Sequence, residues 1–521
     1  MKRLVLVTAA VSLGAGPLSA APANAAPATA SAVKWGKCAV SGPDDPMTKA
    51  QCAQVPVPLD HRRPNGRKIS IAISRVKATD RRNYQGVLLI NPGGPGGSGL
   101  AFSAGMARWL TAVGHPETAA RYDIIGFDPR GVGSSKPALT CDPSHFNPVR
   151  PDYRPADAAQ ERAWLAKSKR YADACARKFG WLLPHMRTTD SARDMDVIRR
   201  ALGRPKISFY GFSYGTYLGA TYGTLFPKRV KRMVLDGNVN AKEVWYRSQL
   251  SQNAAFERNI RLWWRWIAKW NARYELGTTQ AAVEKRYYQV RAQAKQQPIG
   301  GKIGPSELDD IVLNAGYNTG WYPLLATALS DWAVGKDAGL LLQLVNPGGE
   351  DNDFAVYNAV QAVDARWPAK WSTWHNDAVR TYPRARFNTW SNVWFNAPIH
   401  FWKVKGGPAF RLNGRGMPGV LLVQSSLDAA TPYQGGVEMH RLLPSSRLLV
   451  EVGGKTHSNT LNGNACLDDR VAAYLNAGGL PASKKGPDAY CKAVPALNDP
   501  DPTAARGAGR VTGKDLPVGL R

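Results

Sequence analysis

The 521-residue sequence lacks several patterns that would assign it to familiar classes of protein. It contains no Cys-x-x-Cys pair, which disfavours a zinc ribbon or a dithiol redox site. The Walker spacing of nucleotide-binding loops is absent, and no internal repeat points to a solenoid or a propeller. Beyond the N-terminus, no apolar run is long enough to span a bilayer. With 44% apolar residues, the chain is instead expected to be globular with a large core.

Acidic residues are scarce relative to basic ones. The chain has 39 Asp and Glu against 68 Lys and Arg, which gives a formal net charge of +29. A nucleic-acid-binding protein would gather its basic residues on one stripe, whereas here they are scattered along the sequence. We therefore expect a solvated basic surface, no nucleic-acid partner, and at most weak association with anionic cell-wall polymers.

Only six cysteines are present, and all follow the N-terminal segment. An even number of cysteines in an exported chain indicates disulfides. Pairing between sequence neighbours is expected, although spacing alone leaves other pairings open. The expected pairs are Cys38–Cys52, Cys141–Cys175 and Cys466–Cys491.

The N-terminus has the features of a secretory signal. Lys2 and Arg3 precede an apolar run over residues 4–13, and Ala-Asn-Ala at 23–25 fits a cleavage site. A membrane anchor is the alternative, but the run is too short to span and is followed by glycine and proline. We predict that residues 1–25 are a signal peptide and that the mature protein is secreted, monomeric and free of the membrane.

Short runs rich in Val, Ile and Leu alternate with helical patterns, which predicts an α/β fold with a mostly parallel sheet. A helix is expected over 189–202, where apolar residues recur at helical spacing. The candidate strands are Lys68–Val76, Gly86–Ile90, Tyr122–Phe127, Lys206–Tyr210, Lys231–Leu235, Gly419–Gln424 and Arg447–Val452.

In the middle of the chain the strand signals fade, and Trp-rich helical segments such as "RLWWRWIAKW" replace them. This change predicts a helical cap inserted into the α/β core. We expect core residues at 26–236 and 418–497, the cap at 237–417, and a flexible tail at 498–521, where Pro, Gly and Ala accumulate. Most of the tryptophans are expected to pack between helices.

The stretch "YGFSYGTYLGA" places a G-x-S-x-G motif after a predicted strand and before a predicted helix at 216–226. In a nucleophile elbow, small flanking residues let a strained serine sit on a sharp strand-to-helix turn. This context predicts that Ser213 is a nucleophile.

A serine nucleophile needs a base and an acid, and on this type of sheet both follow later strand ends. Asp428 follows the strand in "GVLLVQSSLDAATP", and His457 follows the last strand in "RLLVEVGGKTHSNT". Asp236 is an alternative acid, one strand earlier, or else a turn residue before Gly237. The other histidines after the serine are weaker candidates for the base because of their places in the sequence: His375, His400 and His440.

Two loops are expected to complete the site. The N–H groups of Tyr214 and of Gly94, in "LLINPGGPGGSG", are predicted to form an oxyanion hole. A plain Gly/Pro turn is the alternative for that loop. Asp128 and Arg130, in "YDIIGFDPRGVGSS", are expected to pair or hydrogen-bond at the floor of the site, chiefly in a structural role.

These motifs, together with "RDMDVIRRALG" and "AVYNAVQAVDARWPAKW", resemble secreted bacterial tripeptidyl aminopeptidases, which are α/β-hydrolase peptidases related to prolyl iminopeptidase. The resemblance runs from about Trp35 to Cys491. It implies an α/β-hydrolase fold, release of short peptides, typically tripeptides, from free N-termini of peptides and proteins, and no metal or organic cofactor. Carried over by position, the family's triad corresponds to Ser213, Asp428 and His457.

An exopeptidase also needs a carboxylate that binds the substrate's N-terminal ammonium. Asp364 is the first candidate because it ends the matching "AVYNAVQAVD" stretch, with a surface or capping role as its alternative, and Glu257 is named beside it. The expected cap also offers Asp309, Asp310 and Asp331. A carboxylesterase or lipase with the same triad, and a non-catalytic binding protein, are the alternative functions.

Overall fold

The computed structural model describes residues 33–345 and 351–494. The predicted signal peptide (1–25) and the tail from residue 498 lie outside the described residues. Among the helices that the structure describes, none combines the length and apolar character that crossing a bilayer requires.

The described strands form one sheet in the order β1-β2-β3-β5-β4-β6-β7-β8-β9-β10. The pairings β1–β2, β2–β3 and β3–β5 are antiparallel, and those from β5 through β4 to β10 are parallel. The strands are β1 Gly36–Lys37, β2 Gln51–Pro58, β3 Lys68–Val76, β4 Gly86–Asn91, β5 Tyr122–Phe127, β6 Ile207–Phe212, β7 Val230–Asp236, β8 Val420–Ser425, β9 Ser446–Val452 and β10 Ala489–Lys492.

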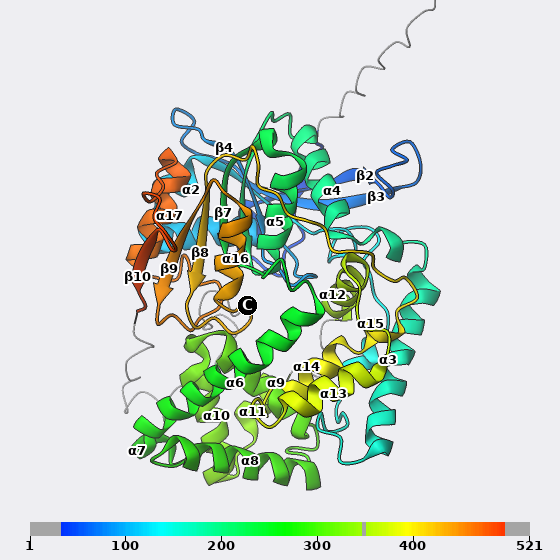
Figure 1. Cartoon of the computed structure of the whole chain (residues 1–521). Coiled ribbons are helices and arrows are strands. Elements are labelled where there is room, and N and C mark those ends of the chain that lie inside the picture. The colour runs from blue at the N-terminus through cyan, green and yellow to red at the C-terminus, as the bar shows by residue number, and fades with distance from the viewer. Residues whose placement is uncertain (1–32, 346–350, 495–521) are drawn as a thin grey trace, which may run out of the picture. The chain divides into compact units, whose positions relative to one another are not determined.

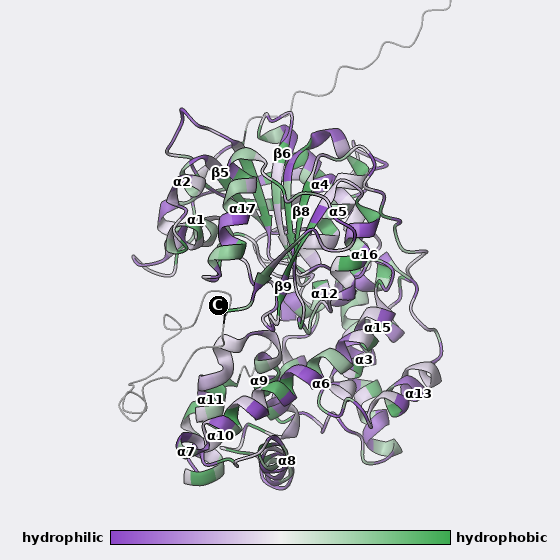
Figure 2. Ribbon diagram, turned by 60° about the vertical axis from the view of Figure 1, so that its left-hand side comes forward, coloured by the Kyte–Doolittle hydropathy of each residue, from purple (hydrophilic) through white to green (hydrophobic). Residues whose placement is uncertain are grey.

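Both faces of the sheet are buried, which explains the near-continuous apolar runs of its central strands (Figure 2). On β4, Leu88 and Ile90 join the apolar cluster that includes α1 and α17, while Val87 and Leu89 join the cluster of α4, α5 and α16. This alternation is the two-residue period of a strand. The helices are α1 Phe102–Ala112, α2 Pro116–Ala120, α3 Ala158–Phe179, α4 Thr188–Ala201, α5 Tyr214–Leu225, α16 Gln434–Leu442 and α17 Ala465–Ala477.

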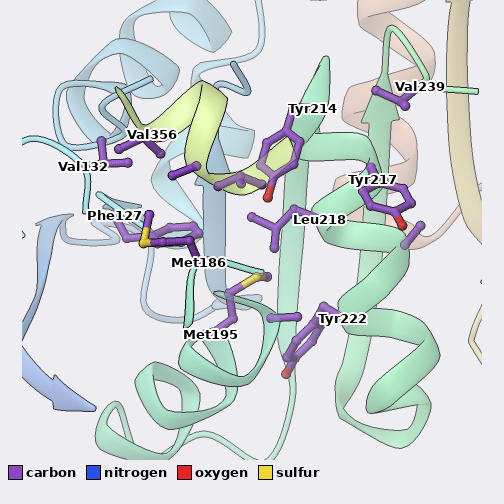
Figure 3. Packing of buried hydrophobic residues seen from close by; sticks show 14 of the residues in the cluster. Phe127, Val132, Met186, Met195, Tyr214, Tyr217, Leu218, Tyr222, Val239 and Val356 are labelled. Atoms are coloured by element: carbon purple, nitrogen blue, oxygen red, sulfur yellow. The ribbon is translucent and has the colours of Figure 1, made fainter. Parts of the chain in front are cut away.

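The helix that follows the serine is deeply buried, because residues 214–223 are all buried. Figure 3 shows its side chains Tyr214, Leu218 and Tyr222 within one apolar cluster that also contains Met195 of α4. Such dense packing leaves α5 little freedom to shift. The first residues of α5, beside Ser213, are therefore held firmly.

All the helices between β7 and β8 belong to one segment, residues 237–419, which we call the helical insertion (Figure 1). Its described part contributes no strand to the sheet. The helices are α6 Tyr246–Lys269, α7 Asn271–Tyr274, α8 Gln280–Gln296, α9 Pro305–Tyr317, α10 Tyr322–Gly335, α11 Gly339–Leu344, α12 Asp351–Asp364, α13 Trp371–Thr381, α14 Thr389–Asn396 and α15 Pro398–Phe401. The 3₁₀ turns of the described chain are η1 Pro46–Lys49, η2 Pro143–Phe146, η3 Leu183–His185, η4 Pro227–Arg229 and η5 Thr319–Trp321.

The insertion packs against helices from outside its own segment. Trp164 of α3 stacks on Trp394 of α14, with ring centroids 5.5 Å apart. Val356 of α12 lies in the same apolar cluster as α5. Many insertion tryptophans, including Trp263 and Trp264, are fully buried, so they form packing core as expected.

The seven predicted strands are all present, with ends within two residues of those expected, whereas β1, β2 and β10 were not predicted. The helix expected over 189–202 is α4, and that expected over 216–226 is α5. The three expected disulfides also form, between Cys38 and Cys52, Cys141 and Cys175, and Cys466 and Cys491.

Candidate active site

Ser213 occupies a strained turn between β6 and α5. Its backbone has φ 55° and ψ −124°, a conformation that non-glycine residues adopt rarely and usually at functional sites. A Cβ at Gly211 would lie 2.4 Å from the carbonyl oxygen of Gly215, and one at Gly215 would lie 2.7 Å from that of Asn91. Glycine is therefore required on both sides for the chain to turn this sharply.

Asp428 and His457 lie on loops that follow β8 and β9, and their side chains are hydrogen-bonded. His457 Nδ1 is 2.8 Å from Asp428 Oδ2 and 3.0 Å from Oδ1. The fully buried carboxylate of Asp428 also accepts hydrogen bonds from the N–H groups of Ala430 and Thr431 and from the Thr431 hydroxyl. It is thus fixed in the orientation that holds the imidazole.

Two opposing effects act on the imidazole of His457. Burial by itself lowers the pKa, but the charge of Asp428 and the hydrogen bond to it outweigh burial and raise the pKa above the ordinary 6.5. Stabilising the imidazolium in this way makes His457 a stronger base. That is the property needed in a group that takes a proton from a hydroxyl.

Ser213 and His457 line the same two cavities, one of about 440 Å³ and one of about 350 Å³. Among the described residues, no hydrogen bond joins the hydroxyl to the ring. Such bonds are often loose in enzymes without bound substrate. The structure therefore brings the three predicted residues to the carboxyl edge of the sheet, with Ser213 and His457 around a shared space and Asp428 buried beside the imidazole.

The other candidate bases lie elsewhere and do not line the cavities that contain Ser213. His375 contacts Glu161, and His440 contacts Ser446. His400 lies against Trp371.

Among the described residues, Asp236 makes no hydrogen bond to the imidazole but anchors the loop that carries it. Its Oδ2 accepts hydrogen bonds from the Thr460 N–H at 2.9 Å and the Thr460 hydroxyl at 2.6 Å. Its backbone carbonyl accepts from the N–H of Ser213 and the hydroxyl of Ser458. Burial raises the pKa of this carboxyl to about 7. Asp236 is thus placed to hold the turn of the serine beside the loop of the histidine.

The loop after β4 brings its backbone against the serine. A Cβ on Gly93 would lie 2.6 Å from the Phe212 carbonyl oxygen and 2.9 Å from Ser213 Cβ. Among the residues that the structure describes, the N–H of Gly94 has no acceptor. Tyr214 is the first residue of α5, where N–H groups have no acceptor within the helix. Gly94, Tyr214 and Ser213 all line a smaller cavity of about 140 Å³.

Asp128 ties this loop to the sheet. Its Oδ1 accepts from the Ser98 hydroxyl at 2.7 Å and the Gly99 N–H at 2.9 Å, and its Oδ2 accepts from the Ser134 N–H. Arg130, the expected partner of Asp128, is instead paired with the buried Asp194 at 2.7 Å. Asp128 and Arg130 are thus each hydrogen-bonded, as one alternative expected, but they do not pair with each other.

The acids predicted to bind a substrate ammonium do not line the three cavities described here that contain Ser213. Asp364 accepts from the N–H and hydroxyl of Thr188, at 2.7 and 2.5 Å, and burial raises its pKa to about 6. Glu257 is paired with Arg261 and accepts from the Phe387 N–H. Asp364 thus joins α12 to the start of α4, and Glu257 joins α6 to the turn before α14, so neither carboxylate is assigned to the substrate.

Two other acids reach the cavities. Asp310 lines the 350 Å³ cavity, but its carboxylate is paired with Arg150 at 2.6 Å. Glu243 lines the 140 Å³ cavity with Ser213, and its carboxylate accepts from the Ser251 hydroxyl at 2.8 Å. Within the described residues, Glu243 has no cationic partner. Sequence reasoning missed it, although its position shortly after β7, at the carboxyl edge of the sheet, is a usable signal.

No group of three or more His, Cys, Asp or Glu side chains in the described ranges is arranged to hold a metal ion. The arrangement of Ser213, His457 and Asp428 is compatible with nucleophilic attack by a serine hydroxyl, with an imidazole as its base.

Comparison with known proteins agrees with this geometry. Residues 86–300 match the family model of the alpha/beta hydrolase fold, and residues 385–491 match that of TAP-like proteins. The tripeptidyl aminopeptidase of Streptomyces coelicolor is 42% identical over 87% of this chain and 85% of its own. Two relatives from Mycobacterium tuberculosis are serine protease Hip1, 30% identical over 87% of this chain and 90% of its own, and carboxylesterase B, 33% identical over 86% and 88%. The chain belongs to the tripeptidyl aminopeptidase family of α/β hydrolases.

Proposed function

We propose that the protein is a serine exopeptidase that releases short peptides, typically tripeptides, from the free N-termini of peptides and proteins. The observation that carries the proposal is the Ser213 elbow, which shares its cavities with an imidazole that is hydrogen-bonded to a buried carboxylate. Similarity over most of the chain to a tripeptidyl aminopeptidase supports the choice of substrate.

In this mechanism Ser213 attacks the scissile carbonyl while His457 takes its proton. Asp428 orients the ring and stabilises its charged form. The N–H groups of Tyr214 and Gly94 bind the oxyanion of the tetrahedral intermediate. His457 then donates the proton to the leaving amine and later activates the water that hydrolyses the acyl-enzyme.

Glu243 is the group we assign to the substrate's N-terminus. An ammonium removed from water needs a carboxylate near it, and Glu243 faces the cavity of Ser213 without a cation of its own. The hydroxyl of Ser251 holds one of its oxygens, so the carboxylate is oriented before substrate arrives. Such a contact distinguishes a free N-terminus from a blocked one.

We further propose that the insertion, over about residues 237–417, acts as a cap that limits how many residues fit between Glu243 and Ser213. The released length would then be set by this span. Secretion through the signal at residues 1–25 belongs to the same proposal, and N-terminal sequencing of exported protein tests it.

A carboxylesterase is the second candidate, favoured by the relative that bears that name. An esterase needs the same triad but no group for an ammonium. The two candidates are separated by comparing a tripeptide anilide with its N-acetylated form.

We expect the free tripeptide anilide to be cleaved much faster than the acetylated one. Equal rates, or turnover of esters alone, would establish the esterase instead. In Ser213→Ala, turnover should fall by roughly 10⁴–10⁶-fold while the thermal unfolding midpoint stays close to that of the wild type. An unchanged rate in this variant would exclude Ser213 as the nucleophile.

A further inference from the structure

The 440 Å³ cavity beside Ser213 differs from the other two in its walls. It contains Ser213 and His457 but neither Gly94, Tyr214 nor Glu243. None of its lining residues is Asp, Glu, Lys or Arg, in a chain whose net charge is +29. We call it the aromatic cavity because of the following rings in its wall: Phe102, Trp109, Phe212, Tyr317 and Trp321.

One wall comes from the core. The rings of Trp109 and Phe102, both on α1, meet edge to face at 5.2 Å, and Phe102 lies 6.4 Å from Phe212 at the end of β6. These rings form a continuous apolar surface that ends next to Ser213. Covering this surface with an apolar group of a substrate would favour binding, because it removes apolar area from water.

The opposite wall comes from the insertion, through Tyr317 of α9 and Trp321 of η5. Amide side chains are also present here but are engaged within their own elements. Asn314 donates to the carbonyls of Asp310 and Ile311, and Asn318 accepts from the Gly320 N–H at 2.8 Å. Thr456, Ser458, Thr460 and Asn462 also line the cavity, and each already has a hydrogen-bond partner in the protein. Apolar contact with the rings is therefore the main interaction that the cavity offers a guest.

The positions of Glu243 and His457 indicate on which side of the scissile bond the aromatic cavity lies. The proposed ammonium contact, Glu243, lies in the 140 Å³ cavity with the oxyanion donors, so the released peptide extends that way. His457, which must give its proton to the leaving amine, lines the aromatic cavity and the 350 Å³ cavity but not the 140 Å³ cavity that contains Glu243. Tyr317 in its wall is 38% exposed, and Asn462 is exposed as well. This opening lets the remaining substrate chain continue into solvent.

We propose that the aromatic cavity is the subsite for the residue that follows the scissile bond, here called the leaving residue, and that it selects large apolar or aromatic side chains. The inference rests on the proposed peptidase function. A charged leaving residue would lose its hydration without meeting an opposite charge, and a glycine would leave the aromatic walls uncovered. Selection therefore acts on the acylation step, in which the leaving residue is still attached.

A peptide series tests the proposal. The substrates are Ala-Ala-Ala-Xaa-Ala-Ala hexapeptides with a free N-terminus and Phe, Leu, Gly, Asp or Lys as Xaa, and mass spectrometry identifies the bond that is cut. We expect kcat/KM for Phe and Leu to exceed that for Gly, Asp and Lys by roughly 10–100-fold, the scale of discrimination by an apolar pocket.

The other outcomes of this series are distinct. Equal kcat/KM across the series would overturn the subsite while leaving the peptidase intact. In a second series with the third residue varied and Phe kept after the cut, a strong apolar preference at the third residue alone would place the cavity on the released side and also overturn it. Cleavage of esters but of no peptide would overturn both the subsite and the proposed function.

A charge placed in the wall sharpens the test. Asn318→Asp keeps the oxygen that accepts from the Gly320 N–H and adds a carboxylate facing the aromatic cavity. We expect the ratio of kcat/KM for Lys over Phe as leaving residue to rise at least about tenfold, because the ion pair offsets the lost hydration. An unchanged ratio in folded protein would contradict the assignment.

The matched control is Gln434→Glu, which adds the same charge to the 140 Å³ cavity on the other side of Ser213. It should leave the Lys over Phe ratio unchanged. Trp109→Ala is an independent variant in case Asn318→Asp does not fold. It removes one aromatic wall, and we expect the advantage of Phe over Gly to shrink about tenfold. A fluorophosphonate label counts active molecules in each sample.

Discussion

The carboxyl edge of the sheet and the helical insertion both contribute to the surroundings of Ser213, but they contribute different things. The edge supplies the groups proposed to react, and Asp428 among them is fixed by buried hydrogen bonds from Ala430 and Thr431. The insertion supplies Glu243 and the outer wall of the aromatic cavity. In the roles proposed here, the reacting groups come from the edge alone, whereas substrate choice draws on both parts, because the rings of α1 in the core form the other wall of the aromatic cavity.

The two parts are nevertheless joined by hydrogen bonds at the catalytic loops. Asn259 of α6 donates to the carbonyl oxygen of Leu427, the residue before the acid, at 2.9 Å. The N–H of His457 donates to the carbonyl oxygen of Tyr317 in α9 at 2.7 Å. The insertion therefore also supports the loops that carry the acid and the base.

The largest effect is expected from a change confined to the sheet edge. Asp428→Asn should lower kcat by about 10⁴-fold, because the amide no longer fixes the reactive tautomer of His457. Asp236→Asn is the matched control, since an amide oxygen can still accept from Thr460. Its kcat should fall less than about tenfold. Steady-state kinetics on one tripeptide anilide measures both, and a larger loss in Asp236→Asn would reverse the assignment of the acid.

A change confined to the insertion should alter substrate choice instead. Glu243→Gln removes the charge but keeps the shape, so kcat/KM for a free N-terminus should fall by roughly 10–100-fold. The rate on the acetylated substrate should change little, since it carries no ammonium. Asp310 is the matched control: because Arg150 already neutralises it, Asp310→Asn should keep the preference for free N-termini. A loss of that preference in Asp310→Asn alone would transfer the role to Asp310.

Residues that join the two parts should show a smaller, mixed effect. Asn259 is fully buried and also donates to Gly316 and Lys455. Asn259→Ala should lower stability by about 1–3 kcal/mol and kcat by about tenfold, because the acid loop loses its support.

Asn396 provides the control for that variant. It is a buried amide of the insertion that bonds only to Asn392 and Tyr357 among the described residues. Asn396→Ala should destabilise the protein to a similar degree without lowering kcat. Denaturant unfolding and kinetics on the same samples separate the two effects, and equal kcat values for both variants would show that the insertion does not support the loops.

The sequence predicted the carboxyl edge of the sheet better than it predicted the helical insertion. Ser213, Asp428 and His457 were predictable because each follows a short apolar strand, and parallel strands bring their carboxyl ends to one edge. The prediction of that convergence needed no knowledge of side-chain packing. Strand β2, which pairs antiparallel with β3, was not predicted. Its two prolines, Pro56 and Pro58, argue against a strand because proline has no N–H to donate.

The insertion could not be predicted to the same depth. Helical periodicity shows which face of a helix is buried but not which helix it meets, so the partners of a buried acid stay unknown. Asp364 was chosen for its place in a matching stretch, yet its carboxylate binds Thr188 of α4. Glu243 has no periodic pattern around it, and its place shortly after β7 does not by itself show that its carboxylate lines a cavity.

The pH dependence of kcat/KM should distinguish the contribution of the sheet edge from that of the helical insertion. His457 must be neutral to act as a base, and its pKa is raised above 6.5 by Asp428. The rise of kcat/KM with pH should therefore have its midpoint above 6.5 for both the free and the acetylated substrate. By linkage, the stability that the ion pair contributes is present below the unfolded-state pKa and is lost as pH rises through the folded-state pKa.

At high pH only the free substrate should lose activity, because its own ammonium deprotonates near pH 8 and no longer pairs with Glu243. The loss should amount to a few-fold, the smallest effect of the set. Glu243→Gln should remove most of this decline while leaving the rise at low pH unchanged, since the rise belongs to the sheet edge. A decline of equal size with the acetylated substrate would assign it to the enzyme and remove the argument that Glu243 binds the N-terminus.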